Sequence, residues 1–530
     1  MHLPVGLFAL CAAAIVAAWY WLGAPVQMPA SPLDAGEKLY CLSYAPFREQ
    51  QNPLGSGTKV EPAQIDEDLA RLSRVTNCVR TYSIEHGLDR IPEIARRHGM
   101  KVLQGLWLSG LADKNREQVE TTIALAKQFP DVIQAVFVGN EVLLRGEMSA
   151  ADLARTIRQV KSQVSMPVTY ADVWEFWLRH REVTDAVDFV TIHILPYWED
   201  FPIPARNAAA HVDSIRKQVA AAFPDKQVLI GEAGWPSAGR MREGALPSPV
   251  NQARVLHEVL AAAKSGNYQV NLIEAFDQPW KRQLEGTVGG HWGLFDAYKR
   301  EAKFAWGAAV SDHPLWPWQA GGGVVFAALV FAAGWLAGRG PSQASDVWMG
   351  IAISAAGAGV LLGWAIAHVP LESLGAGGWL RSLSLAGLAA AAPLVGAVAL
   401  ARGVPLQSFA GVLADWRRRD GLRLALGTLF LLLAVLAIVV ALGLVFDPRY
   451  RDFPFAPLTA ATVPFLVLAM LVPAPVGRRG AAELVAAALL AASAVYILFN
   501  ESFANWQALW FCAVLAGLVV ILLRVRDGPG

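Results

Sequence analysis

The chain of 530 residues lacks a charge bias and has few cysteines. Its 45 Lys and Arg residues nearly balance 44 Asp and Glu residues, so the formal net charge is +1. We expect no nucleic-acid partner, because such partners require a basic surface. Of its four cysteines, Cys11 and Cys512 lie in apolar segments, whereas Cys41 and Cys78 begin two predicted strands. A Cys41–Cys78 disulfide needs an oxidising compartment, and small buried residues are also common at such positions, so the sequence leaves this pairing open.

The sequence also lacks the motifs of metal and dinucleotide sites. No group of His, Cys and Asp residues has metal-ligand spacing, and no glycine-rich fingerprint follows a predicted strand. We therefore expect neither a catalytic metal nor a cofactor.

Hydrophobic residues make up 54% of the chain and are unevenly distributed. Residues 34–312 have the mixed composition of a globular domain, whereas the chain from about residue 318 is rich in Ala, Leu, Val and Gly. Residues 5–23 are apolar over about the length of a membrane span and end in aromatic residues typical of a membrane interface. The predicted parts are an uncleaved signal-anchor at 1–24, a linker at 25–37, a soluble domain at 38–310 and a membrane domain of about seven transmembrane helices at 318–524.

Arginines between the predicted spans indicate an orientation. If the N-terminus lies inside, ten arginines fall on the inner side and three on the outer side, and positive residues favour the cytoplasm. The soluble domain then lies outside the cytoplasm, and without a eukaryotic sorting signal we expect a multi-pass protein of a bacterial inner membrane with this domain in the periplasm. The inner set is Arg339, Arg402, Arg417, Arg418, Arg419, Arg423, Arg478, Arg479, Arg524 and Arg526, and the outer set is Arg381, Arg449 and Arg451.

Short apolar strands alternate with helical segments through the soluble domain. Eight such units in this length predict an α/β fold, a (β/α)8 TIM barrel, followed by the α-helical membrane domain. An open doubly wound sheet is the competing arrangement, but the dinucleotide fingerprint is missing. The predicted strands are Tyr40–Ala45, Cys78–Tyr82, Val102–Trp107, Val132–Val138, Val168–Asp172, Phe189–Leu195, Val228–Gly231 and Asn271–Phe276.

Two of these strands lead into a lone glutamate, Glu141 after the fourth strand and Glu232 after the seventh. Ionised carboxylates are rarely placed at the edge of a core unless something pairs with them. Because active sites of (β/α)8 barrels lie at the C-terminal ends of the strands, the pair predicts a general acid and a nucleophile, the groups that glycosidic bond cleavage needs.

Other polar and aromatic residues also gather at strand ends, where they suit the apolar faces and hydroxyl rim of a sugar ring. Two have plain structural alternatives: Arg80 as a salt-bridge partner and His193 as a core histidine with satisfied hydrogen bonds. The candidate substrate-binding residues at strand ends are Tyr44, Arg80, Asn140, His193, Tyr197, Trp235 and Trp280.

Three segments resemble family 17 glycoside hydrolases, the β-1,3-glucanases and glucanosyltransferases. Residues 228–239, VLIGEAGWPSAG, are similar to the nucleophile motif of this family. Residues 138–141, VGNE, are similar to the Asn-Glu motif of the wider barrel clan, and residues 285–296, EGTVGGHWGLFD, extend the resemblance. The likeness covers about residues 38–305.

The resemblance implies roles for individual residues. Glu141 would be the proton donor and Glu232 the nucleophile of a retaining mechanism, with Asn140 bonding the sugar 2-hydroxyl. The sixth strand reads TIHILPYWE, so whether His193 or Tyr197 contacts the nucleophile stays open.

After the eighth strand, Lys281 and Glu285 resemble a polar pair of the family, whereas Gln278 stands where plant members tend to carry Glu.

A family 17 domain joined to several spans also resembles bacterial proteins named β-(1→6)-glucan synthases. The longest loop on the predicted inner side, at about 401–423, is too short for a nucleotide-sugar polymerase. We therefore expect remodelling of β-1,3-glucan by transglycosylation, with β-1,6 branches or links as one product, or by hydrolysis. The expected partners are a β-glucan, membrane lipid and, as a candidate, a glucan synthase glycosyltransferase. The alternatives are a non-catalytic glucan-binding scaffold and an export component of a synthase complex.

Overall fold

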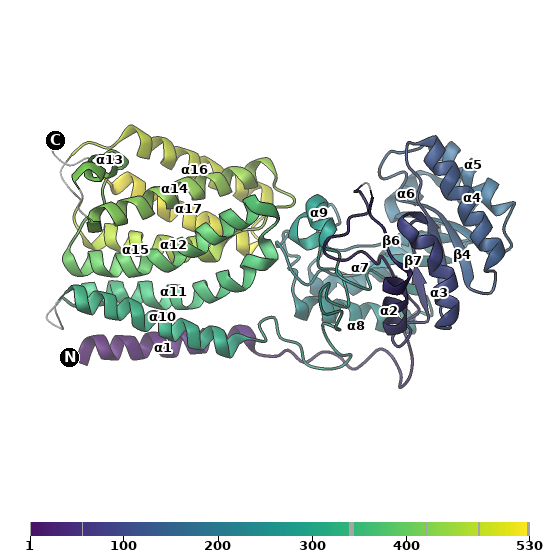
Figure 1. The fold of residues 1–530 in the computed structure, drawn as a ribbon, viewed down its shortest axis with the longest axis horizontal. Helices are drawn as coiled ribbons and strands as arrows, with labels where there is room; N and C mark the ends of the chain where they lie inside the picture. The colour runs from purple at the N-terminus through teal and green to yellow at the C-terminus, as the bar shows by residue number, and fades with distance from the viewer. Residues whose placement is uncertain (1, 56, 339–343, 419–420, 475–476, 527–530) are drawn as a thin grey trace. The chain divides into compact units, whose positions relative to one another are not determined.

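The chain folds into two compact units, a barrel and a bundle of apolar helices (Figure 1). This computed structural model describes residues 2–55, 57–338, 344–418, 421–474 and 477–526. The barrel unit comprises residues 26–238 and 244–310. The helical unit comprises residues 1–25, 239–243 and 311–530.

The barrel unit contains eight parallel strands that close into a barrel in chain order, with β1 paired to β8. The predicted (β/α)8 fold is therefore confirmed. Each predicted strand is present, although the first, second, sixth and eighth are shorter than expected. The strands are β1 Cys41–Ser43, β2 Cys78–Arg80, β3 Lys101–Leu106, β4 Ile133–Asn140, β5 Val168–Val173, β6 Val190–His193, β7 Val228–Ala233 and β8 Val270–Leu272.

Helices connect these strands and bury one apolar face each. In α5, Leu153, Ile157 and Val160 are buried at the spacing of one helix face, and the side chain of Ser149 caps its first turn. The helical segments of this unit are α2 Pro62–Leu72, η1 Glu85–Arg90, α3 Ile91–Arg97, α4 Ala112–Gln128, α5 Ala150–Lys161, α6 Trp174–Arg179, η2 Arg181–Ala186, α7 Ala205–Ala222, α8 Pro249–Ser265, η3 Pro279–Lys281 and α9 Arg282–Gly289.

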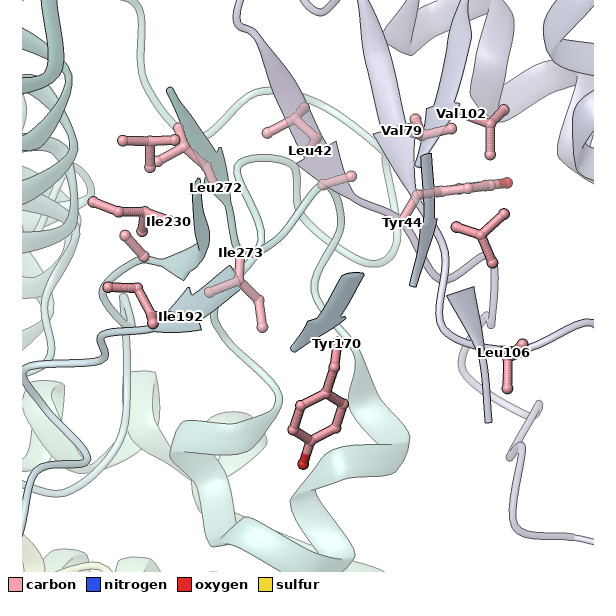
Figure 2. Close-up of a cluster of buried hydrophobic side chains, with 14 of the residues drawn as sticks. Leu42, Tyr44, Val79, Val102, Leu106, Tyr170, Ile192, Ile230, Leu272 and Ile273 are labelled. Carbon is pink, nitrogen blue, oxygen red and sulfur yellow. The ribbon is translucent and has the colours of Figure 1, made fainter. Parts of the chain in front are cut away.

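The alternation of side chains along the strands separates two cores. Leu42, Val79, Val102 and Ile230 belong to the large cluster between strands and helices (Figure 2). Their neighbours Cys41, Cys78, Leu103 and Leu229 belong to a smaller cluster together with Phe137. Cys41 and Cys78 form a disulfide, which resolves the pairing that the sequence leaves open.

The helical unit contains the apolar segments predicted at both ends of the chain. Seven of its described helices are long and apolar enough to cross a membrane, and α15, with 17 residues, is a shorter apolar helix. Arg339 and Arg419, two of the arginines used to predict orientation, lie outside the described residues. The helices are α1 His2–Gly23, α10 Trp316–Ala337, α11 Ser345–Glu372, α12 Gly375–Arg402, α13 Phe409–Arg418, α14 Gly421–Phe446, α15 Phe455–Leu471, α16 Ala481–Glu501 and α17 Trp506–Arg524.

Candidate active site

The C-terminal ends of β4, β6 and β7 bring two glutamates and a histidine together. A register shift between β6 and β7 places His193 opposite Glu232. One imidazole nitrogen of His193, Nδ1, lies 2.9 Å from Oε1 of Glu141, and the other, Nε2, lies 3.4 Å from Oε1 of Glu232. His193 therefore bridges the two carboxyls that the sequence predicts to work as a pair.

The backbone around Glu141 turns sharply at the end of β4. Glu141 has a φ of 52°, in the left-handed region, and Gly139 has a φ of 89°. The Glu141 amide donates to the carbonyl of Ala171 over 2.8 Å, and its carbonyl accepts from the Arg145 amide over 2.9 Å. These bonds hold an unfavourable backbone conformation, which is common at functional sites.

Arg80 holds the nucleophile candidate from β2. Its Nη1 donates to Oε1 of Glu232 over 3.0 Å and to the carbonyl of Gly231 over 2.8 Å, and its Nη2 donates to Oδ1 of Asn140 over 2.6 Å. Arg80 is 1% exposed, and Glu232 is the carboxylate that pairs with its buried charge. A side chain at Gly231 would meet Thr191 at 2.4 Å, so only glycine leaves room here.

The hydrogen bonds favour one tautomer of His193. Arg80 Nη1 also lies 3.2 Å from His193 Nε2, and a guanidinium can only donate. If Nε2 accepts this bond, the proton is on Nδ1 and is donated to Glu141. His193 is thus both a well-bonded core residue and a direct contact of both glutamates.

Tyr82 is a contact of Glu232 to which the sequence assigned no role. Its hydroxyl lies 2.8 Å from Oε1 of Glu232 and 2.6 Å from Oγ of Ser43, which also accepts from Asn271 over 2.8 Å. Burial and the neighbouring Glu232 raise the pKa of Tyr82 well above its usual value, so the phenol remains a hydrogen-bond donor. Its position at the end of β2 was the only sequence signal for it.

Opposing effects set the pKa of Glu141. Burial by itself raises this pKa, but the hydrogen bond from His193 and the nearby positive charges, Arg145 and Arg80 among them, outweigh burial. The pKa of Glu141 is therefore lowered. The Arg145 guanidinium is fixed over the Trp107 ring at 4.1 Å and donates to the carbonyl of Leu108 over 2.7 Å.

A second carboxyl, Asp172 at the end of β5, supports the loop that follows Glu141. Burial raises the pKa of Asp172 to about 6, although a hydrogen bond from the Tyr170 hydroxyl opposes this effect. The Tyr170 hydroxyl also accepts from the amide of Leu143 over 3.0 Å. Asp172 and Tyr170 thus fix the backbone just beyond Glu141.

A buried ion pair follows β8. Both oxygens of Glu274 lie 2.9 Å from Nζ of Lys281, and Glu274 is 2% exposed. Burial raises the pKa of Glu274 to about 7, with Lys281 acting in the opposite direction and Glu285 in the same direction. The sequence pointed to Lys281 and Glu285 but missed Glu274, because a single glutamate inside an apolar strand has no pattern of its own.

A metal ion needs several ligand atoms close together. Such atoms are offered by Glu141, His193 and Glu232, and they lie within 4.8 Å of one another. The guanidinium of Arg80 lies 3.0 Å from Oε1 of Glu232, inside this group of residues. A cation placed there would face this fixed positive charge at close range, so the residues do not fit a metal.

The predicted aromatic residues divide into two groups. Tyr44, Tyr197 and Trp235 are 1%, 0% and 0% exposed, and the Tyr44 hydroxyl donates to Asp68 over 3.0 Å. These three rings pack in the core and offer no face to a sugar. Trp280 is half-buried, with Nε1 donating to Gln278 over 2.8 Å, and is open to solvent on part of its ring.

Comparisons with known proteins agree on the barrel. The BtgE/BtgC glycoside hydrolase domain matches residues 41–293. A glucan 1,3-beta-glucosidase of Candida albicans is 26% identical over 265 residues, which cover 46% of this chain and 86% of that protein. A probable beta-glucosidase, btgE, of Aspergillus fumigatus is 28% identical over 264 residues, which cover 48% of this chain and 45% of that protein.

Among solved structures, a glycoside hydrolase family 17 beta-1,3-glucanosyltransferase from Rhizomucor miehei is 27% identical, with a TM-score of 0.45. The matched region covers 52% of this chain and 99% of the Rhizomucor miehei chain. An active-site mutant of the same enzyme, in complex with laminaritriose, is 26% identical with the same TM-score. Residues 41–293 are therefore a glycoside hydrolase domain of the BtgE/BtgC type, homologous to glucan 1,3-beta-glucosidases.

Proposed function

We propose that the barrel is a retaining enzyme of β-1,3-glucan that uses Glu232 as nucleophile and Glu141 as general acid and base. The observation that carries this proposal is the short separation of the two carboxyls, which offer oxygens within 4.8 Å of each other. Retaining glycosidases place their carboxyls about 5 Å apart, whereas inverting ones need roughly 6.5–9.5 Å to admit a water.

In the first step, the Glu232 carboxylate attacks the anomeric carbon while Glu141 gives its proton to the leaving oxygen. Arg80 and Tyr82 keep the Glu232 charge in place before the attack. Glu141 must hold a proton when the substrate binds, and a bound sugar removes water from this carboxyl. Desolvation raises a carboxyl pKa, so substrate binding itself favours the protonated acid.

Asn140 is suited to bind the 2-hydroxyl of the sugar being transferred. Its Oδ1 accepts from Arg80 over 2.6 Å, which orients the amide group. Its Nδ2 makes no hydrogen bond to any other residue that the structure describes. The Asn140 amide therefore has a donor to offer a substrate.

The glucosyl-enzyme can be released by water or by a sugar hydroxyl. We favour transfer to sugar, because the half-buried Trp280 beside Lys281 offers a stacking face for an acceptor. The relatives named above, a glucan glucosidase and a glucanosyltransferase, support a β-glucan substrate. New β-1,6 branches or links are one possible product of transfer.

Product analysis tests this function. The full chain in detergent is incubated with laminari-oligosaccharides at millimolar concentration, and products are sized and their linkages read by NMR. Products longer than the donor support transfer. If only shorter products form at every concentration, the enzyme is a hydrolase. Azide with Glu141→Ala should release a β-configured glycosyl azide from an activated substrate. An α-configured azide would contradict the assigned roles.

The apolar helices support a membrane protein, and the arginine distribution supports a barrel outside the cytoplasm of a bacterium. A cytoplasm-active reporter fused after Arg402 should be active, and one fused after Trp292 should be silent. The reverse result would contradict the periplasmic proposal. A non-catalytic role as scaffold or export component of a glucan synthase complex would instead predict normal function with Glu232→Gln in place.

A further inference from the structure

Polar side chains from β1, β8 and the end of β2 form a chain of hydrogen bonds inside the barrel that ends at Glu232. Asn271 of β8 is 0% exposed, and Ser43 of β1 is 1% exposed. Nδ2 of Asn271 donates to Oγ of Ser43 over 2.8 Å. Oγ of Ser43 lies 2.6 Å from the hydroxyl of Tyr82, and this hydroxyl lies 2.8 Å from Oε1 of Glu232. Because buried polar groups cost free energy unless they are bonded, these three side chains depend on one another.

The register of the strands brings this chain together. Cys41 lies opposite Asn271 in the pairing of β1 with β8, and Ser43 lies opposite Arg80 in the pairing of β1 with β2. Residues two positions apart on a strand point to the same face, so Ser43 shares the face of Cys41, which belongs to the smaller core cluster. The backbone carbonyl of Ser43 accepts from the amide of Ala275 over 2.9 Å, which fixes the end of β1. Ser43 is therefore held between Asn271 and the residues at the end of β2.

The two ends of the chain determine the direction of its hydrogen bonds. Nδ2 of Asn271 also lies 2.7 Å from the carbonyl of Gly231, and a carbonyl can only accept, so the nitrogen of the amide faces this side. An ionised carboxylate can only accept as well, so the hydroxyl of Tyr82 donates to Glu232. The single proton of the Ser43 hydroxyl is then donated to the oxygen of Tyr82. Each hydroxyl thus accepts from one neighbour and donates to the next, in the direction of Glu232.

We propose that Ser43 is a positioning residue of the glycosidase reaction, which directs the Tyr82 proton toward Glu232 and is itself oriented by Asn271. Hydrogen bonds that run in one direction polarise one another, so the phenol becomes a stronger donor to the carboxylate. A donor that is fixed in advance needs no rearrangement when negative charge leaves Glu232 in the first step and returns to it in the second. The inference rests on the proposed function, because it takes Glu232 as the nucleophile.

Steady-state kinetics of the full chain in detergent, with laminari-oligosaccharides as substrate, test this proposal. Ser43→Ala should lower kcat on the order of 10-fold and leave KM within about twofold of wild type, because this buried hydroxyl does not contact the sugar. Ser43→Thr keeps a hydroxyl on the same carbon and should restore most of kcat. In a Tyr82→Phe background the phenol is missing, so adding Ser43→Ala should change kcat by less than about twofold.

A matched control separates this role from a loss of packing. Thr169 is also 0% exposed in the barrel, and its hydroxyl lies 2.9 Å from that of Thr191. Thr169→Val should therefore retain the wild-type kcat. Near-UV circular dichroism checks that each variant is folded. If Ser43→Ala does not fold, Asn271→Ala takes its place in both backgrounds, since the Gly231 carbonyl still accepts from Arg80 over 2.8 Å.

Three results would overturn the inference. They are a wild-type kcat in Ser43→Ala, an equal loss of kcat in the wild-type and Tyr82→Phe backgrounds, and a folded Ser43→Thr that is as slow as Ser43→Ala. The proposed function is tested separately by Glu232→Gln. If Glu232→Gln is inactive while Ser43→Ala has a wild-type kcat, only this inference fails. If Glu232→Gln keeps full activity, the proposed function fails.

Discussion

The barrel pairs its buried charges, whereas one pocket of the helical unit leaves two of them open. In the barrel, Arg80 meets Glu232 at 3.0 Å, Arg300 meets Asp68 at 2.5 Å and Lys281 meets Glu274 at 2.9 Å. In the helical unit, Glu372 and Arg381 line one pocket without an ion pair between them. Buried charges are thus joined in ion pairs at these three places in the barrel, but not between Glu372 and Arg381.

Paired charges hold groups in fixed positions, which a reaction needs because its transition state tolerates little movement. The barrel mouth is thus organised before substrate arrives, whereas no ion pair joins Glu372 and Arg381 in the helical unit. The following predictions, ordered from the largest expected effect to the smallest, test that contrast.

Removing the nucleophile should have the largest effect. Glu232→Gln keeps the size of the side chain and its hydrogen bonds to Arg80 and Tyr82 but removes the attacking charge. We expect turnover of laminari-oligosaccharides to fall on the order of 10⁴-fold or more, measured by product release. Glu182→Gln, at an exposed position in η2, is the control and should retain full activity. Activity of Glu232→Gln near that of wild type would remove the catalytic assignment.

Removing Arg80 should destabilise the barrel. Arg80→Met leaves Glu232 buried without its ion-pair partner, which costs about 3–5 kcal/mol in the free energy of unfolding. Chemical unfolding followed by near-UV circular dichroism measures this change, with the exposed Arg90→Met as control. Arg381→Met, by contrast, should cause little loss of stability. Equal costs at Arg80 and Arg381 would erase the distinction between these two sites.

Replacing His193 should change the pH dependence of catalysis. His193→Leu removes the hydrogen bond that lowers the pKa of Glu141, and burial then raises this pKa against the charges of Arg145 and Arg80 alone. The basic limb of the kcat/KM profile, where the acid loses its proton, should move to higher pH, and the rate at the optimum should fall on the order of 10²-fold. His193→Gln, which keeps a donor, should restore part of both properties. An unmoved basic limb in His193→Leu would exclude this role.

Asp172 should make stability depend on acidity. Because burial raises its pKa to about 6, the folded chain holds this proton more tightly than the unfolded chain. The stabilising contribution is full below the ordinary pKa of Asp, near 4, and is lost as the pH rises to 6, by at most about 3 kcal/mol. Wild type should therefore lose stability relative to Asp172→Asn over that range. Asp185→Asn, at an exposed position, is the control, and its free energy of unfolding should vary with pH as that of wild type does. If the free energy of Asp172→Asn also varies with pH in parallel with that of wild type, the effect is refuted.

The smallest effect is expected in the helical pocket. Glu372→Gln replaces the carboxyl by an amide of the same size without breaking an ion pair among the described residues, so the free energy of unfolding should change by less than about 0.5 kcal/mol. Turnover of short oligosaccharides should also stay at the wild-type rate. A large loss of stability would mean that Glu372 is structural and that the contrast with the barrel is wrong.

Much of the architecture could be predicted from local patterns. Short apolar strands, each followed by a helical stretch, identify the eight strands, because strand and helix periodicities differ in the sequence. The apolar segments at both ends of the chain can be recognised equally well from the sequence. Glu141 and Glu232 were found because each follows an apolar strand directly, and the ends of parallel strands meet at one edge.

The sequence pointed to Arg80 and His193 as neighbours of the glutamates, but it assigned no role to Tyr82 or Glu274. Tyr82 reaches Glu232 from β2, 150 positions away in the chain, and Glu274 pairs with Lys281 only because β8 ends before it. Tyr44, Tyr197 and Trp235 looked like sugar contacts because they follow strands, but a strand-end residue can turn into the core as readily as into the mouth. The position of a residue in the sequence does not indicate whether its side chain turns into the core or into the barrel mouth.

The sequence by itself determined the repeated strand and helix pattern, the apolar ends of the chain and the two glutamates, since hydrophobic periodicity and strand ends are local properties. Only the tertiary structure decided that His193 joins both carboxyls. That contact depends on a register shift between β6 and β7, and register is set by how two distant strands pack. It also decided that Glu372 and Arg381, on neighbouring helices, share one pocket without pairing, because the distance between their charged groups depends on helix packing.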